Sequence, residues 1–279
     1  MTGRILQNNN GLYSVETADG VAEFRARGGV KRTKLYCGDF AIIEDGVIVG
    51  VEERKNLLIR PSVANIDLIV AVISPIPKPD FLMLDKLIIN CRNLYIDLAI
   101  VINKSDLHDS SLVEYVKSNY ADAVDYILET TALDGKVEEI KNIIKGKTVC
   151  LAGQSAVGKS SIINALMESN VTLTGELSKK IERGKNTTVS SRLYKLAGGY
   201  VMDTPGFGLL DAHGVTCEDL KLFYADYCGC EYVNCNHIDE PGCEVRSRAE
   251  KGLVSKDRYE RYKIIYSELK TKGDKYEKR

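Results

Sequence analysis

Nine consecutive residues, GQSAVGKSS from 153 to 161, match the phosphate-binding pattern G-x-x-x-x-G-K-[ST]. Gly153 and Gly158 allow the backbone to turn its N–H groups inward around a chain of phosphates. The ammonium group of Lys159 then reaches the β- and γ-phosphates, and the hydroxyl group of Ser160 ligates Mg²⁺. The residues expected to surround the phosphates are Gly153, Gln154, Ser155, Ala156, Val157, Gly158, Lys159, Ser160 and Ser161.

The segments on either side of this loop predict a strand before it and a helix after it. Residues 148–152 form a short apolar run, which is typical of a buried strand. Residues 160–167 have the pattern of a helix, and a helix that begins at the loop directs its free N–H groups at a bound anion. This setting makes phosphate binding the favoured interpretation of the pattern.

A second candidate segment is Asn103-Lys104-Ser105-Asp106, which follows the apolar run of residues 98–102. The Asp106 carboxylate can accept hydrogen bonds from N1–H and the exocyclic amino group of guanine. Adenine offers no such pair of donors, so ATP would leave this carboxylate unpaired and would be rejected. We expect Asn103 to tie neighbouring loops together and Lys104 to lie along the base.

Two further segments complete a set that would bind a guanine nucleotide. Thr131-Ala132 follows a predicted strand, residues 125–128, and is similar to the S-A turn with which guanine-nucleotide-binding domains offer a backbone N–H group to the guanine O6. On its own the pair would be an ordinary turn. A D-x-x-G pattern begins at Asp203 and ends at Gly206. There Asp203 would hold Mg²⁺ through water, and the Gly206 N–H group would sense the γ-phosphate.

Residues 170–191 show no steady periodicity and contain RGKNTT at 183–188. They are the expected place for a switch segment, in which Thr187 or Thr188 meets Mg²⁺ and the γ-phosphate. The alternative is a flexible surface loop, and the two interpretations are compatible. The residues predicted around Mg²⁺ are Ser160, Thr188 and Asp203.

A cluster of cysteines with one histidine predicts a metal site. Cys230, Cys235, His237 and Cys243 have the spacing C-x4-C-x-H-x5-C. Three thiolates and one imidazole make a closed tetrahedral set, and closed sets hold structural Zn²⁺. Cys228 is an alternative ligand, but Cys228 and Cys230 are too close in sequence for both to ligate comfortably, so we favour Cys230. Core cysteines without a metal are the weaker alternative, because this polar segment is rich in loops.

Residues 1–64 predict a small β-barrel, for which an OB-fold is the natural candidate. The alternation of residues 21–27 places Ala22 and Phe24 on one face of a strand. An Asp-Gly pair at 45–46 lies between two apolar runs and predicts a hairpin.

Residues 65–215 alternate between apolar strands and helices, which is typical of a parallel α/β sheet. The run 66–73 is almost continuously apolar, as in a strand buried on both faces. A helix is expected over 134–145. Residues 216–279 combine the cysteine cluster with a helical tail. One apolar stripe of this tail is predicted from Leu253, Tyr259, Tyr262, Ile265 and Leu269.

The charge of the chain is unevenly distributed. The net charge is −1, but residues 244–279 carry 12 basic and 7 acidic side chains. This tail and the basic segment 25–34 fit contact with RNA phosphates, and a solvated surface is the alternative in both places. The chain shows neither a signal peptide nor an apolar run that could cross a membrane. We therefore expect a cytoplasmic protein whose cysteines stay reduced.

The order of the nucleotide-binding segments is rotated relative to common small GTPases. In those proteins the phosphate-binding loop comes first, whereas here N-K-S-D and T-A precede it. A circular permutation moves the chain ends and keeps every contact. With the barrel before this set and the cysteine cluster after it, the chain resembles, over essentially its full length, the circularly permuted bacterial GTPases called ribosome small-subunit-dependent GTPase A.

The resemblance implies a multidomain α/β protein with an OB-fold, a permuted P-loop GTPase domain and a C-terminal zinc-binding domain with helices. It implies a monomer that binds GTP and GDP, contacts the 30S ribosomal subunit and its 16S rRNA, and acts late in the maturation of that subunit. It also implies that GTP is hydrolysed faster on the subunit. The predicted catalytic residues are Lys159, Thr188 and Asn186.

Two positions bear on hydrolysis. Phe207 stands where many GTPases have a glutamine that orients the attacking water, and the family shares this apolar replacement. The family usually has a histidine where this chain has Asn186, and asparagine can bind a water but cannot titrate near neutrality. The alternative function is a nucleotide-gated RNA-binding module with negligible hydrolysis. A P-loop ATPase or kinase is a weaker third possibility.

Overall fold

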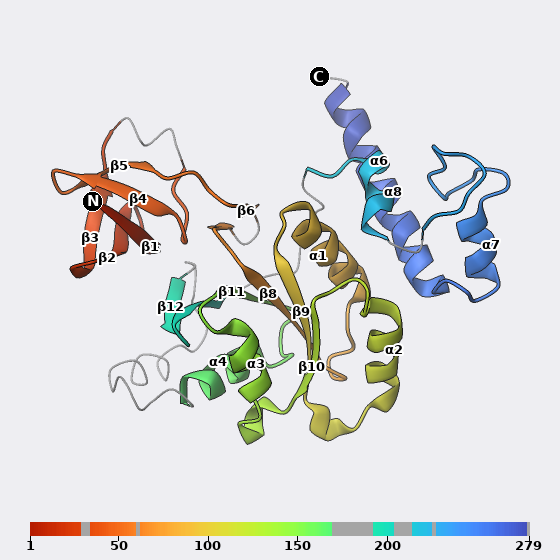
Figure 1. Ribbon diagram of the computed structural model, residues 1–279, viewed down its shortest axis with the longest axis horizontal. Coiled ribbons are helices and arrows are strands. Elements are labelled where there is room, and N and C mark those ends of the chain that lie inside the picture. Colours follow the sequence, from red (N-terminus) through yellow and green to blue (C-terminus); the bar gives the residue numbers. More distant parts are fainter. Residues whose placement is uncertain (29–33, 60–61, 169–191, 204–213, 225–226, 278–279) are drawn as a thin grey trace.

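The chain forms a β-barrel, a central sheet with helices on both faces, and a helical C-terminal part (Figure 1). The barrel adjoins one edge of the central sheet, and the C-terminal helices pack beside a helix on one face of that sheet. Within the described ranges, no helix combines the length and the apolar composition that crossing a bilayer requires. This computed structural model describes residues 1–28, 34–59, 62–168, 192–203, 214–224 and 227–277.

Five strands close into the barrel: β1 (Thr2–Asn9), β2 (Leu12–Thr17), β3 (Gly20–Ala26), β4 (Phe40–Glu44) and β5 (Val47–Val51). They pair in the order β1-β2-β3-β5-β4, and β1 also pairs with β4, which closes the barrel. The β4–β5 hairpin turns at Asp45 and Gly46, whose φ angles are 50° and 74°. The predicted OB-like barrel and its hairpin are confirmed.

The alternation predicted for residues 21–27 holds only in part. Phe24 is buried in the barrel core with Ile5 and Ile48, but Ala22 is exposed. The reason is that β3 pairs with β5 only at Arg25 and Ala26. The portion of β3 around Ala22 therefore extends beyond β5 and is not covered on that side.

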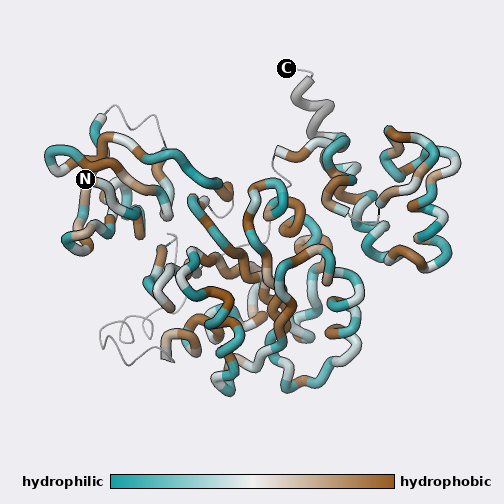
Figure 2. The backbone as a smooth tube through the Cα atoms, in the orientation of Figure 1, coloured by the Kyte–Doolittle hydropathy of each residue, from teal (hydrophilic) through white to brown (hydrophobic). Residues whose placement is uncertain are grey.

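The central sheet has the strand order β10-β9-β8-β11-β13-β12, and only β12 runs antiparallel to its neighbour. Both β8 and β11 are buried along their whole length, as predicted. The central strands are also the most consistently apolar part of the chain (Figure 2). The strands are β8 (Leu68–Ile73), β9 (Asp97–Asn103), β10 (Tyr126–Thr130), β11 (Thr148–Ala152), β12 (Arg192–Leu196) and β13 (Gly199–Asp203); a two-stranded ribbon, β6 (Leu57–Ile59) and β7 (Ser62–Ala64), precedes them.

Helices cover both faces of the central sheet, which confirms the α/β prediction. One face packs against α1 (Phe81–Asn93) and α2 (Ser110–Tyr120), and the other packs against α3 (Glu138–Ile144) and α4 (Lys159–Glu168). The helix predicted over 134–145 begins later, at Glu138. Gly135 has a φ of 69° and ends the short 3-10 turn Ala132–Asp134, so the helix cannot continue back through it.

The C-terminal part contains α6 (Cys217–Leu220), α7 (Glu244–Glu250) and α8 (Lys256–Glu277). Tyr259, Tyr262, Ile265 and Leu269 of α8 are buried in one core cluster, as predicted. The prediction for Leu253 is wrong, because its side chain is 68% exposed. Leu253 follows a turn at Gly252, whose φ is 72°, and precedes the first residue of α8, so helical spacing does not extend to it.

Candidate functional site

The predicted phosphate-binding loop connects the end of β11 to the start of α4. Gly153 and Gly158 have φ angles of 139° and 99°, which other residues rarely adopt. Neighbouring atoms also leave no room for a side chain at either position. A Cβ atom on Gly153 would lie 2.2 Å from the Val72 carbonyl oxygen, and one on Gly158 would lie 2.1 Å from Nδ2 of Asn103. Both positions therefore require glycine.

The lysine of this loop lies over the loop's own backbone. Lys159 Nζ donates hydrogen bonds to the carbonyl oxygens of Gly153, at 2.8 Å, and Gln154, at 2.7 Å. Val157 is fully buried and anchors the loop to the core, whereas Ser155 is exposed. The ammonium group is thus held at the position where the sequence pattern predicts the phosphates.

Asn103, at the end of β9, joins three loops. Its Nδ2 donates to the carbonyl oxygen of Val157 at 2.9 Å, and its Oδ1 accepts from the N–H group of Ala132 at 3.2 Å. The side chain is 3% exposed, so water competes little for these bonds. The N-K-S-D, T-A and phosphate-binding segments therefore lie together at the carboxyl edge of the parallel strands, where ligands of such sheets bind.

The remaining residues predicted to read the base lie beside Asn103. Lys104 Nζ donates to the Ala156 carbonyl oxygen at 2.9 Å, which connects it to the phosphate-binding loop. The hydroxyl groups of Ser105 and Thr131 are 2.8 Å apart. Asp106 is exposed in the turn Ser105–Leu107. Its carboxylate is accessible to a base that approaches this edge.

The residues predicted to contact the γ-phosphate are only partly placed. Asp203 is the last residue of β13, and its backbone lies opposite Leu151 of the strand that leads into the phosphate-binding loop. Asn186, Thr187, Thr188, Gly206 and Phe207 lie outside the described residues.

Two contacts with residues 76–80 were not predicted from the sequence. The Gln154 Oε1 atom accepts a hydrogen bond from the Asp80 N–H group at 3.0 Å, and Lys104 Nζ also donates to the Ile76 carbonyl oxygen at 2.6 Å. The proline-rich segment 75–79 thus borders the nucleotide site. The signal was available, because this segment follows the predicted strand 66–73, and parallel strands all end at the same edge of a sheet.

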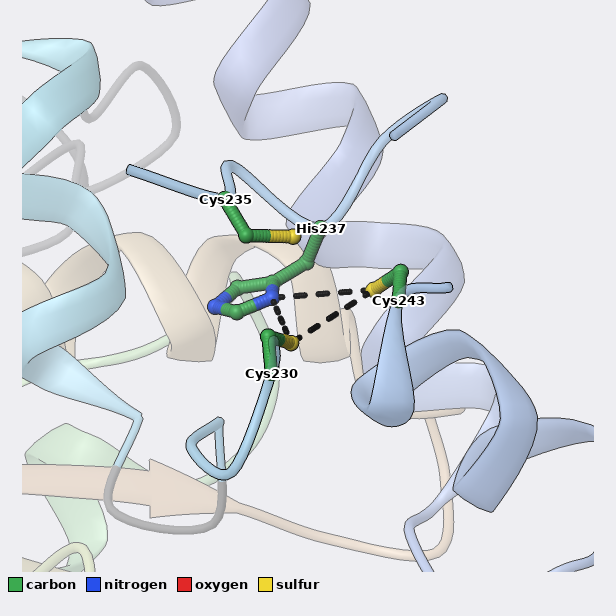
Figure 3. A group of neighbouring side chains, drawn as sticks. All are labelled: Cys230, Cys235, His237 and Cys243. Atoms are coloured by element: carbon green, nitrogen blue, oxygen red, sulfur yellow. Dashed lines mark hydrogen bonds between the residues drawn. The ribbon is translucent and has the colours of Figure 1, made fainter. Parts of the chain in front are cut away.

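The predicted metal ligands converge in the C-terminal part (Figure 3). Their ligand atoms all lie within 4.8 Å of one another. His237 Nδ1 is 3.3 Å from Cys230 Sγ and 3.7 Å from Cys243 Sγ, and these two sulfurs are 3.9 Å apart. A tetrahedral Zn²⁺ with ordinary bond lengths separates two sulfurs by about 3.8 Å and a sulfur from a nitrogen by about 3.5 Å. The side chains therefore fit Zn²⁺. Cys235 is the fourth member of the group, whereas Cys228 is exposed and lies outside it.

Hydrogen bonds from neighbouring residues hold the ligand loop. The hydroxyl groups of Tyr259 and Tyr262 on α8 donate to the carbonyl oxygens of His237 and Asn236, at 2.7 and 2.8 Å. The Glu240 carboxylate accepts from the N–H groups of Asn236 and Ile238, at 2.9 and 3.0 Å. Burial alone would raise the pKa of Glu240, but these N–H groups hold it below its ordinary value.

Comparison with known proteins identifies the family. The model of the family described as RsgA GTPase matches residues 51–213. A protein of Agathobacter rectalis described as small ribosomal subunit biogenesis GTPase RsgA is 36% identical to this chain, covering 98% of this chain and 99% of its own length. A protein of the same description from Fusobacterium nucleatum is 37% identical, covering 91% of this chain and 94% of its own.

Comparison with solved structures indicates the same family as the sequence comparison. The crystal structure of YjeQ from Thermotoga maritima superposes with a TM-score of 0.78 at 33% identity, covering 96% of this chain and 98% of that one. The crystal structure of YloQ, described as a circularly permuted GTPase, has a TM-score of 0.73 at 28% identity, covering 97% and 95%. The rotated segment order, the fold and these matches together show that the chain belongs to the RsgA GTPase family.

Proposed function

We propose that this protein hydrolyses GTP to GDP and phosphate and acts in the biogenesis of the small ribosomal subunit. One observation carries the proposal: the Asn103 amide joins the base-reading loop to the phosphate-binding loop by hydrogen bonds to Val157 and Ala132. Groups suited to guanine and groups suited to phosphates therefore face one edge of the sheet. The name small ribosomal subunit biogenesis GTPase RsgA, carried by a relative that is 36% identical, supports the cellular role.

In this proposal the guanine base lies against Asp106. The Ala132 N–H group, which the sequence predicted for the guanine O6, donates to Asn103 Oδ1 in this structure and is not assigned to the base. The phosphates lie in the loop that runs from Gly153 to Ser161, close to the Lys159 ammonium group. Mg²⁺, when bound with GTP, supplies positive charge that offsets the charge developing on the β- and γ-phosphate oxygens. Its proposed ligands are Ser160, Thr188 and, through water, Asp203.

Hydrolysis then depends on how the attacking water is held. We assign that role to the Asn186 side chain, which can donate to and accept from a water molecule but cannot carry a proton away near neutrality. Lys159 stabilises the negative charge on the transferred phosphoryl group, and Thr188 and Gly206 contact the γ-phosphate. Positioning and charge, rather than general base catalysis, are the basis of this mechanism.

The proposed partner is the small ribosomal subunit, contacted through its 16S rRNA late in maturation. Two basic regions support an RNA partner: the segment 25–34 next to the barrel, and residues 244–279, which carry 12 basic side chains. Zn²⁺ has a structural role in the C-terminal part. We further propose that the protein acts as a monomer in the cytoplasm, and that its three domains span residues 1–64, 65–215 and 216–279.

Single-turnover hydrolysis of GTP with and without purified 30S subunits tests this function. The proposal expects the first-order rate constant to rise when subunits are added at saturating concentration. A rate that is negligible under both conditions would instead support the nucleotide-gated RNA-binding module. Hydrolysis of ATP as fast as GTP would overturn the assignment of Asp106 to the base.

A further inference from the structure

The barrel is joined to the strands that carry the nucleotide site. Strand β1 of the barrel pairs with β12 through Gln7 and Arg192, so barrel and central sheet form one continuous set of hydrogen-bonded strands. Strand β12 in turn pairs with β13, and Arg192 lies opposite Asp203. In Figure 1 the barrel accordingly lies beside β12.

Arg4 of β1 reaches across this junction and contacts two strands of the central sheet at once. Its guanidinium carbon lies 4.5 Å from the centre of the Tyr200 ring and 5.2 Å from the centre of the Phe40 ring. Its Nη2 atom donates to the hydroxyl oxygen of Thr148 at 2.7 Å and to the Asn65 carbonyl oxygen at 3.3 Å.

The contacts of Arg4 with Thr148 and Tyr200 are on two strands that lead to different parts of the proposed nucleotide site. Thr148 is the first residue of β11, which leads into the phosphate-binding loop, and Tyr200 belongs to β13, which ends at Asp203. Because a strand rises by about 3.3 Å per residue, the Arg4 contacts lie about 10 to 15 Å from the loops that they could influence.

The groups around Arg4 fix its position. Glu16, opposite Arg4 in the β1–β2 register, accepts a hydrogen bond from the Tyr200 hydroxyl group and pairs with Lys195 of β12 at 2.9 Å. The Thr148 N–H group donates to the Asp67 carboxylate at 2.9 Å. A planar guanidinium between two aromatic rings, with a hydrogen bond to a buried hydroxyl group, is a rigid contact that lysine cannot reproduce.

We propose that Arg4 is a positioning residue for GTP hydrolysis, which couples RNA binding by the barrel to the placement of β11 and β13 at the nucleotide site. The inference rests on the proposed function, because it requires that the small subunit stimulates hydrolysis. In this role Arg4 contacts neither GTP nor the reacting atoms. It transmits the position of the barrel to the starts of the two strands whose other ends carry the phosphate-binding loop and the D-x-x-G pattern.

The test uses two variants that break the same contact from opposite sides. Arg4→Met removes the guanidinium and keeps an unbranched apolar stem, and Thr148→Val removes only the hydroxyl group that accepts its hydrogen bond. Arg54→Met is the matched control. Arg54 also lies over an aromatic ring, Tyr36, and also forms hydrogen bonds, but to Asp39 and the Lys34 carbonyl oxygen, which precede the central sheet. All three are tested in the full-length protein by single-turnover GTP hydrolysis with and without 30S subunits.

We expect Arg4→Met and Thr148→Val each to lower the subunit-stimulated rate constant by about tenfold, within the usual range of coupling between two sites. The KM for GTP, the rate without subunits and the affinity for the subunit should stay close to wild type. The double variant should be no worse than Arg4→Met alone, because the Arg4–Thr148 hydrogen bond that Thr148→Val removes is already absent in Arg4→Met. Arg54→Met should lower the melting temperature and keep the ratio of stimulated to unstimulated rates.

The outcomes separate this inference from the proposed function. If subunits do not stimulate the wild-type protein, the proposed function is wrong. If subunits stimulate hydrolysis by the same factor in wild type and in both variants, Arg4→Met and Thr148→Val, the proposed function stands and the role of Arg4 is wrong. Additive losses in the double variant would also overturn it, as would a loss of coupling in Arg54→Met as large as in Arg4→Met. Should Arg4→Met fail to fold, Thr148→Val and the control decide the question.

Discussion

Nδ2 of Asn103 lies 2.9 Å from the carbonyl oxygen of Val157, so the loop predicted to read the base and the loop predicted to hold the phosphates share a hydrogen bond. The other end of the same amide accepts a hydrogen bond from the Ala132 N–H group at 3.2 Å. A single buried side chain therefore fixes the relative position of three loops. Nucleotide affinity should depend on Asn103, even though its side-chain amide forms its hydrogen bonds with the protein and not with the nucleotide.

Asn103→Ala is expected to weaken the binding of GDP and GTP together. The substitution leaves the Val157 carbonyl and the Ala132 N–H group without their partner in a buried setting. Each unsatisfied buried group costs about 1–3 kcal/mol, which corresponds to a loss of affinity of roughly tenfold to a hundredfold. Titration with a fluorescent GDP analogue measures the effect. Unchanged affinity would show that the loops hold their positions without this amide.

Gly158→Ala is expected to abolish tight nucleotide binding, because the new Cβ atom would lie 2.1 Å from Nδ2 of Asn103. Gly146→Ala is the matched control: Gly146 also has a positive φ, 72°, but an added Cβ atom there would meet nothing within 4 Å. The control should lose about 1–2 kcal/mol of unfolding free energy from backbone strain and should keep its affinity. Equal nucleotide affinities for the two variants would contradict the steric argument.

Cys235→Ser is expected to lose bound Zn²⁺ and to unfold mainly the C-terminal part, because the four ligands hold the loop between α6 and α7 together. Cys228→Ser should keep its full metal content, since Cys228 is exposed and lies outside the ligand group. Metal analysis of the purified variants and limited proteolysis measure both effects. Full Zn²⁺ in Cys235→Ser, or a loss in Cys228→Ser, would mean that the ligand set is wrong.

Asp85→Ala is expected to loosen the packing of α8 on α1. Asp85 of α1 is 1% exposed at its side chain and pairs with Arg261 at 2.5 Å and with Arg258 at 3.8 Å. Removing the carboxylate leaves two largely buried guanidinium groups without an ion-pair partner. The loss should lower the free energy of unfolding by about 3–5 kcal/mol.

The matched control for Asp85→Ala is Glu260→Ala on α8, the helix that carries Arg258 and Arg261. Glu260 pairs with Lys263, and its side chain is 51% exposed, so its loss should change the unfolding free energy by at most about 1 kcal/mol. Urea unfolding followed by circular dichroism gives both values. Similar midpoints for the two variants would show that the buried pair does not hold α8 in place.

Much of the nucleotide site could be predicted from the sequence because its segments are short and contiguous. The positions of Gly153, Gly158 and Lys159 follow from the backbone geometry that a phosphate requires, and Asn103 follows a strand that is recognisable by its apolar run. Parallel strands end at one edge of a sheet, so segments far apart in the chain could be expected to meet there. The cysteine and histidine spacing predicted the metal ligands in the same way.

Contacts between parts of the chain that are distant in sequence could not be predicted. Arg4 and Thr148 are separated by 144 positions, and neither residue type is unusual in its local segment. The burial of Asp85 against Arg258 and Arg261 also depends on how α8 packs on α1, which has no local signature. The wrong prediction for Leu253 has a different cause. The helical spacing of the apolar residues in α8 does not extend back to Leu253, which lies between the turn at Gly252 and the start of α8.

The most direct test of the account is the nucleotide preference of Asp106→Asn, measured as kcat/KM for hydrolysis of GTP and of xanthosine triphosphate in the presence of 30S subunits. An amide in place of the carboxylate no longer accepts from the guanine amino group but can donate to the xanthine oxygen that replaces it. Asp134→Asn is the control, because Asp134 is exposed near the same loops and pairs only weakly, with Lys136 at 3.9 Å.

Wild type and Asp134→Asn should prefer GTP. Asp106→Asn should lose kcat/KM for GTP by about a hundredfold or more and gain activity with xanthosine triphosphate. This result would tie hydrolysis to the site built around Asn103 and the phosphate-binding loop. Hydrolysis of GTP by Asp106→Asn at the wild-type rate, with no gain for the xanthine nucleotide, would contradict it.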